Sequence, residues 1–148
     1  KCSCIAVSGP EEACECDILV TTTPSRRPVI SDEWIRPGTH INAIGADAPG
    51  KQELPSILLK RATVVVDDLA QAVHSGEVNV PLSEGSLRPE EIYGQIGEIL
   101  AGKKPGRTSD EEITIFDSTG LGIQDVAAGH AVYEKALKTG VGKRLKLL

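Results

Sequence analysis

Short runs of β-branched and aliphatic residues alternate along this chain with longer segments of helical period. Five such runs are predicted strands: residues 2–7, 16–21, 40–44, 63–66 and 113–116. Several of them, such as Thr63-Val64-Val65-Val66, are continuous rather than alternating in polarity, which is typical of strands covered by helices on both faces. The alternation predicts an α/β domain with a buried parallel sheet.

Three segments of helical period are predicted helices: residues 55–62, 89–102 and 123–140. The second has acidic residues after a proline in its first turn, apolar residues on one face and a glycine at its end. The third would bury Val126, Tyr133 and Leu137 at spacings of seven and four residues. We expect residues 75–89, which lie between helices, to form a mobile surface loop.

Composition narrows the class of function. A net charge of −5 and one Trp, two Tyr and one Phe give little with which to neutralise phosphates or stack on bases, so no nucleic-acid partner is expected. No apolar run approaches the roughly 20 residues that span a bilayer, and no secretory signal is visible, so we expect a cytoplasmic protein without membrane contact. Because the chain has no Met, we expect a processed or partial product.

The cysteines suggest a metal site only weakly. They form two Cys-X-Cys pairs within the first 16 residues, whereas structural zinc favours wider gaps. Buried reduced thiols are the favoured interpretation, with Cys2 and Cys4 on one face of a strand, and no metal site is predicted. Asp67 and Asp68 could ligate a divalent ion, but two carboxylates at a helix N-terminus are the simpler interpretation.

Ligands of open parallel sheets bind beyond the carboxyl ends of the strands, so the loops there are candidate sites. Residues 21–25 form a row of hydroxyls that could hold ribose or phosphate oxygens, or a plain solvated turn. In the loop after the run 40–44, Asp47 offers a carboxylate and Lys51 a cation four residues later. Such a pair can position a polar substrate and move a proton, or be an incidental exposed ion pair.

The loop at 117–125 leads from a predicted strand through two glycines into a helix. A strand, a turn and a helix N-terminus can together bind an anion. However, Asp125 stands where the dinucleotide fingerprint requires a third small residue, so the segment does not match that motif. Ser118 or Thr119 acting as a helix cap is the alternative interpretation.

Longer motifs run through these loops, in residues 16–25, 38–47, 49–54 and 112–121 and in Gln124-Asp125. On these motifs the chain resembles the carboxyl-terminal half of the ornithine cyclodeaminase, mu-crystallin and archaeal alanine dehydrogenase family. The resemblance implies an α/β fold: a partial Rossmann-type parallel sheet with flanking helices, plus a carboxyl-terminal strand and helix segment. Residues 1–112 would be the later part of an NAD-binding domain, and residues 113–148 would return to a substrate and dimerisation domain.

The resemblance also assigns roles to single positions. Asp47 corresponds to the catalytic acid/base and Thr119 to a substrate-binding residue. Positions that would contact the cofactor, NAD, are Thr23, Ile41, Asn42, Ala43, Ile44, Lys51 and Ser118. The implied partners are a small amino-acid substrate, the missing amino-terminal half of the enzyme and a second copy in a homodimer.

The implied function is part of an NAD-dependent L-amino-acid oxidoreductase. Alanine dehydrogenase, which converts L-alanine to pyruvate and ammonia, is favoured because residues 118–121 and Gln124-Asp125 look closer to the archaeal branch. One alternative is an ornithine cyclodeaminase, which converts L-ornithine to L-proline and ammonia. Another, from a different class, is a non-catalytic, crystallin-like dinucleotide-binding protein.

Overall fold

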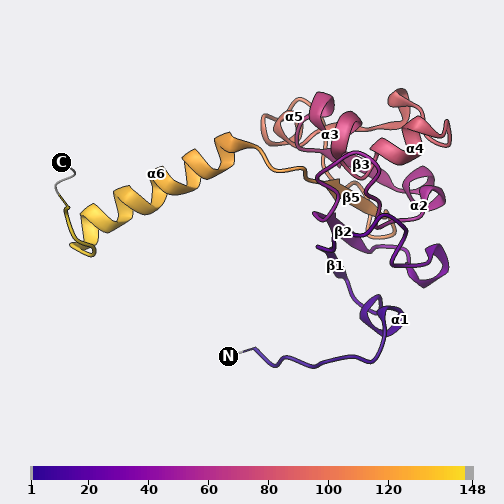
Figure 1. The fold of residues 1–148 in the computed structure, drawn as a ribbon, viewed down its shortest axis with the longest axis horizontal. Coiled ribbons are helices and arrows are strands. Elements are labelled where there is room, and N and C mark those ends of the chain that lie inside the picture. Colours follow the sequence, from indigo (N-terminus) through magenta and orange to yellow (C-terminus); the bar gives the residue numbers. More distant parts are fainter. Residues whose placement is uncertain (1, 146–148) are drawn as a thin grey trace.

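The computed structural model describes residues 2–145, and a five-stranded sheet lies at its centre (Figure 1). Every strand pair is parallel, and the strand order is β1-β2-β5-β3-β4. The strands are β1 (Ile18–Thr21), β2 (His40–Ala43), β3 (Thr63–Val66), β4 (Gly94–Gln95) and β5 (Thr114–Asp117). The prediction of an α/β fold with a parallel sheet is confirmed.

Short helices connect the strands, and one long helix follows the last strand. The α-helices are α1 (Pro10–Ala13), α2 (Ser56–Arg61), α3 (Leu69–Ser75), α4 (Asn79–Ser83), α5 (Ile96–Leu100) and α6 (Gly122–Thr139). Two 3-10 turns, η1 (Asp32–Trp34) and η2 (Pro89–Glu91), complete the described elements. None of the helices in the described part of the chain is long and apolar enough to cross a membrane.

The two faces of the sheet are covered unequally. On one face, Leu19, Ile41 and Ile115 are buried in a core that includes Leu58 and Leu59 of α2. On the other face, α5 covers β3 and β5, where its isoleucines line a hollow with Val65 and Phe116.

That second face stays open at β1, where Ile18 and Val20 are 63% and 55% exposed. The prediction of a sheet buried on both faces is therefore wrong at this edge, because α5 lies over β3 and β5 and no described element covers Ile18 and Val20.

The amino-terminal run is not a strand. Residues 2–7 are irregular and exposed, because a β-branched run needs a partner strand before it can form a ladder. Cys2 and Cys4 are therefore exposed, which corrects the prediction of buried thiols at these positions. Cys14 is buried, and burial raises the pKa of its thiol.

Tertiary contacts override two further predictions. Residues 89–102 are not one helix: the segment forms η2, then β4, which pairs with Val65 and Val66, and only then the five-residue α5. Pairing with a neighbouring strand here outweighs the local helical period. Residues 75–89 are not a plain surface loop, because they contain α4 and bury Glu77, Val78 and Leu87.

Helix α6 confirms the predicted helix at 123–140 and ends at Gly140, whose φ of +68° is left-handed. Its apolar side chains are nevertheless exposed, including Val126, Tyr133 and Leu137, which were expected to be buried. The helix extends away from the sheet, so its apolar residues do not pack on the sheet (Figure 1). By contrast β5, which opens the predicted returning segment 113–148, lies in the middle of the sheet.

Candidate functional site

The loops that follow four parallel strands meet at the carboxyl edge of the sheet. Backbone hydrogen bonds continue past the strand ends: Ile44 donates to Thr21 O at 2.9 Å, and Ser118 donates to Ala43 O at 3.0 Å. Asp67 donates to Asp117 O at 3.1 Å in the same way. The fold therefore gathers the loops that carry Thr23, Asp47, Lys51, Ser118 and Thr119 at one edge, where ligands of parallel sheets bind.

The loop after β2 holds a carboxylate and an ammonium group together. Lys51 Nζ donates to Asp47 Oδ1, and the two side chains are 19% and 59% exposed. This hydrogen bond and the charge of Lys51 hold the pKa of Asp47 below its ordinary value. Asp47 is therefore ionised at neutral pH and can accept a proton.

Asn79 anchors the far end of this loop. Its side chain is buried, donates to Lys51 O at 3.1 Å and accepts from Gly50 N at 2.9 Å. Both partners are backbone atoms next to the ion pair. The hydrogen bonds of Asn79 thus fix the backbone beside the side chains of Asp47 and Lys51.

Glu53 links the loop after β1 to the loop after β2. Its side chain is fully buried, and its carboxylate accepts from Thr23 N at 2.5 Å and from Gly45 N at 2.9 Å. A Cβ atom added to Gly45 would lie 2.5 Å from Glu53 Oε2, so only glycine allows this close approach. Sequence reasoning assigned no role to Glu53, although it lies within one of the family motifs.

Asp67 holds the loop after β5. Its buried carboxylate accepts from Thr119 N at 2.7 Å and Gly120 N at 2.9 Å, and from the hydroxyls of Thr119 and Ser118 at 3.1 and 3.2 Å. These bonds set the orientation of both hydroxyl side chains. Neither residue caps α6, whose N-cap position is Leu121.

The adjacent carboxylate acts differently. Asp68 is the N-cap of α3 and accepts from Gln71 N at 2.9 Å, which confirms the helix-start interpretation for this residue. Asp67 has the loop-holding role instead. Within residues 2–145, no group of three or more His, Cys, Asp or Glu side chains is arranged to hold a metal ion.

Residues 41–44, at and just after the end of β2, differ in whether their side chains are buried. Ile41 and Ala43 bury their side chains in the core, whereas Asn42 is half-buried on the opposite face and Ile44 is partly exposed. Because β2 pairs with both β1 and β5, the backbone of 41–43 is engaged within the sheet. A ligand at this edge can therefore meet the partly exposed side chain of Ile44.

Two further carboxyl groups lie beneath the edge, and sequence reasoning found a role for neither. Glu77 Oε1 accepts from Leu54 N at 2.6 Å and Glu53 N at 2.9 Å, and burial raises the pKa of Glu77 to about 8. Burial likewise raises the pKa of Asp117, to about 7. Asp117 Oδ2 accepts from Val78 N at 3.2 Å, while its buried Oδ1 has no hydrogen-bond partner among residues 2–145.

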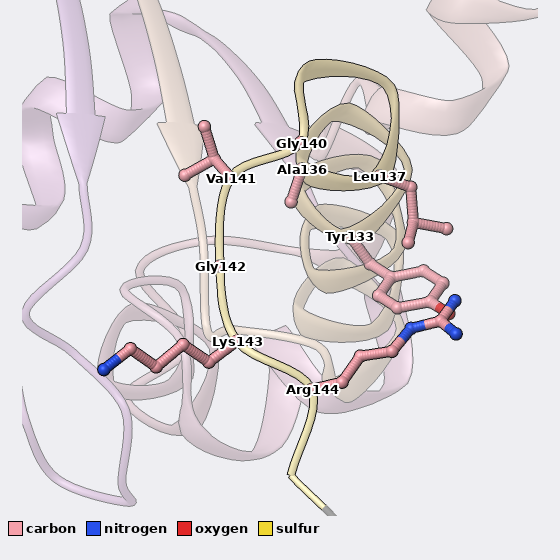
Figure 2. A pocket seen from close by; sticks show the side chains of 8 residues that line it. All are labelled: Tyr133, Ala136, Leu137, Gly140, Val141, Gly142, Lys143 and Arg144. Carbon is pink, nitrogen blue, oxygen red and sulfur yellow. The ribbon is translucent and has the colours of Figure 1, made fainter.

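A hollow of about 470 Å³ lies elsewhere, at the end of α6 (Figure 2). Its lining is Tyr133, Ala136, Leu137, Gly140, Val141, Gly142, Lys143 and Arg144. One helix and the chain that turns back along it form the walls, and the large apolar side chains there are exposed. None of the predicted site residues contributes, so the carboxyl edge remains the candidate site.

Comparison with known proteins finds relatives that match almost the whole of this chain. The sequence pattern of the ornithine cyclodeaminase/mu-crystallin family matches residues 2–140. Alanine dehydrogenase of Archaeoglobus fulgidus is 61% identical over 141 residues, which are 95% of this chain and 44% of that protein. A Delta(1)-pyrroline-2-carboxylate reductase of Bacillus cereus is 40% identical over 144 residues, 96% of this chain and 44% of that protein.

Solved structures of similar proteins also match most of this chain. An archaeal alanine dehydrogenase dimer with bound NAD superposes with a TM-score of 0.87 at 60% identity, covering 97% of this chain and 45% of that one. The Thermococcus litoralis Delta(1)-pyrroline-2-carboxylate reductase, in complex with NADH and L-proline, gives 0.85 at 37% identity, with coverages of 94% and 44%. The chain therefore spans less than half the length of these relatives.

Proposed function

The chain belongs to the ornithine cyclodeaminase/mu-crystallin family, and on this premise we propose that it is the later part of an NAD-dependent L-amino-acid oxidoreductase, an alanine dehydrogenase. The observation that carries the choice of substrate is the 61% identity to an alanine dehydrogenase, against 40% to a pyrroline-carboxylate reductase. The reaction would convert L-alanine, NAD⁺ and water to pyruvate, ammonium, NADH and a proton.

The carboxyl edge fits the nicotinamide end of a dinucleotide. Hydroxyls follow β1 in residues 22–25, and Ser118 presents a hydroxyl held by Asp67. Bound NAD would supply the hydride acceptor. Thr23, Lys51, Ser118, Asn42 and Ile44 are the proposed cofactor wall, with Ile41 and Ala43 supporting it from within β2. A glycine-rich phosphate turn is not found in the 148 residues, so we assign that part to the amino-terminal half.

Asp47 is the proposed acid/base. Its ionised carboxylate can take a proton from water or from the substrate amine as an imino acid forms and hydrolyses. In the structure it is exposed and its pKa is lowered by Lys51. Substrate and the second domain would remove water from Asp47 and move its pKa toward the working pH. Thr119, held by Asp67, is the proposed contact to the substrate.

Two apolar surfaces that the described residues leave exposed support the proposal that this chain is part of a longer enzyme. β1 is an edge strand whose outer face exposes Ile18 and Val20, and α6 exposes apolar residues along its length. We assign residues 1–112 to the NAD-binding domain, with the missing amino-terminal half covering β1. In the segment 113–148, β5 completes the sheet and α6 is the part that would return to a substrate and dimerisation domain. A homodimer, as in the archaeal alanine dehydrogenase structure, is the proposed assembly.

The complete protein, purified and incubated with L-alanine and NAD⁺, tests the proposal. We expect NADH and pyruvate to appear in equal amounts. Proline formed from L-ornithine without net NADH would identify a cyclodeaminase instead, and reduction of Delta(1)-pyrroline-2-carboxylate in preference to pyruvate plus ammonia would identify a reductase. Dinucleotide binding without turnover of any of these substrates would favour the non-catalytic alternative.

A further inference from the structure

We propose that Glu53 is a positioning residue that sets the loop carrying the acid/base against the loop that faces the cofactor. The proposal rests on the function proposed above. One carboxylate oxygen accepts from the backbone of Thr23, in the loop after β1, and the other from Gly45, in the loop after β2. A single side chain therefore fixes the spacing of two loops that are separated in sequence.

Burying the carboxylate of Glu53 costs free energy, which indicates that its two hydrogen bonds do more than stabilise the fold. Glu53 is fully buried, and within residues 2–145 no Lys, Arg or His nitrogen pairs with its carboxylate. Taking an unpaired carboxylate out of water is expensive, and backbone N–H groups are its partners here. A neutral side chain would close these loops with less desolvation, but it could not accept from both with charge-assisted bonds.

Glu53 is itself held from both sides. Its backbone N–H donates to Glu77 at 2.9 Å, and its carbonyl accepts from Val29 N at 2.8 Å. The side chain therefore projects from a fixed backbone, as a positioning residue requires.

The bond from Gly45 to Glu53 also closes the segment 45–53 into a ring. Asp47 and Lys51 belong to this segment, and Asn79 holds its backbone by donating to Lys51 O. The position of Asp47 relative to Thr23 is thus set through Glu53. Misplacing a reacting group by about 1 Å can cost on the order of 100-fold in rate.

The test compares two substitutions of the same kind at opposite ends of the sheet, in the complete enzyme. Glu53→Gln leaves one acceptor and turns an amide toward a backbone N–H, so one tie is lost. Glu112→Gln is the matched control, because Glu112 also joins two segments, accepting from Thr63 Oγ1 at 2.6 Å and Thr108 N at 2.8 Å. Thr63 begins β3, so this pair lies at the amino end.

We expect Glu53→Gln to lower kcat by about 10-fold or more, with a smaller change in KM, and to weaken NADH binding measured by fluorescence titration. Glu112→Gln should change each quantity by less than about 2-fold. Backbone amide exchange at Thr23 and Gly45 should accelerate only in Glu53→Gln. If Glu53→Gln does not fold, Glu53→Asp, which keeps the charge but cannot reach both loops, should show the same losses.

Equal kcat and NADH affinity in the Glu53 and Glu112 variants, at equal melting temperature, would overturn the positioning role. A wild-type enzyme that neither binds NADH nor turns over an amino acid would overturn the proposed function instead. The two failures are therefore distinguishable by the wild-type measurement alone.

Discussion

The carboxyl edge of the sheet and helix α6 differ in which side chains they bury: the edge buries carboxyl groups, whereas α6 exposes apolar side chains. At the edge, the carboxyl groups of Glu53, Asp67, Glu77 and Asp117 are buried and accept from backbone N–H groups. On α6, apolar side chains such as Val132 are exposed. The side chains at the edge are held by hydrogen bonds within the domain, whereas no apolar residue of α6 is buried by the described residues. The difference separates the part that is preorganised from the part that depends on further contacts.

Truncating an apolar side chain should have the largest effect on the free energy of unfolding, and the effect should differ between the sheet and α6. Ile115 in β5 is 1% exposed and Val132 in α6 is 69% exposed. We expect Ile115→Ala to lower the free energy of unfolding by about 2–5 kcal/mol, and Val132→Ala to change it by less than about 0.5 kcal/mol. Urea unfolding of the 148-residue chain measures both. A comparable loss in the two variants would mean that α6 packs against the domain in solution.

The next largest effect separates the two adjacent aspartates. Asp67→Ala leaves the N–H groups of Thr119 and Gly120 without their acceptor, and we expect a loss of about 2–3 kcal/mol. Asp68→Ala removes a helix cap and should cost about 1 kcal/mol. Amide exchange at Thr119 and Gly120 should accelerate only in Asp67→Ala. Equal acceleration in both variants would show that Asp67 has no special hold on the loop.

The buried carboxyl of Glu77 predicts a pH-dependent stability. Its pKa is about 8 in the folded protein, against about 4.3 in an unfolded chain, so folding favours its protonated form. The stabilisation is complete below the unfolded value and is lost as pH rises toward about 8, by up to ~1.4 kcal/mol per pH unit. Burial is the main cause, with the charges of Asp117 and Glu53 adding to it.

Substitution isolates this contribution, because other carboxyl groups titrate too. Glu77→Gln keeps an oxygen that can accept from Glu53 N and Leu54 N, and it cannot ionise. We expect the unfolding free energy of the variant to fall less steeply with pH across this range, as measured by urea unfolding at several pH values. Identical pH dependence in the variant and the wild type would contradict a raised pKa at Glu77.

The smallest effect belongs to the exposed ion pair. Replacing Lys51 with Gln removes the hydrogen bond and charge that lower the pKa of Asp47, so that pKa should rise toward its ordinary value. The urea midpoint should hardly move, because exposed pairs contribute little to stability. Carboxyl chemical shifts recorded by NMR during a pH titration measure the change. An unchanged pKa at Asp47 would show that the pair does not form in solution.

The sequence pattern was sufficient to predict those elements that are determined by residues close to one another in the chain. The run at 63–66, continuous rather than alternating in polarity, predicted β3, and the glycine at 140 predicted the end of α6. The motifs likewise placed Asp47, Lys51 and Ser118 in loops at one edge. These features depend on strand period, helix termination and the parallel sheet, all of which are visible in a single chain.

Long-range contacts explain what the sequence could not predict. β4 forms because Gly94 and Gln95 meet β3, and residues 2–7 stay irregular because no strand meets them. Glu77 lay in a segment predicted to be a surface loop, so its burial beneath the loop after β2 had no local signal. Partners 23 to 53 residues away, such as Leu54 for Glu77 and Gly120 for Asp67, determine these roles.

Replacing Asp47 with Asn tests the central claim most directly. The variant keeps the size of the side chain but cannot accept a proton, so in the complete enzyme we expect kcat with L-alanine and NAD⁺ to fall by about 100-fold or more. NADH affinity, measured by fluorescence titration of the same preparation, should stay within about 3-fold of the wild type. Unchanged turnover in an Asp47→Asn enzyme that still binds NADH would contradict the acid/base role and with it the proposed site.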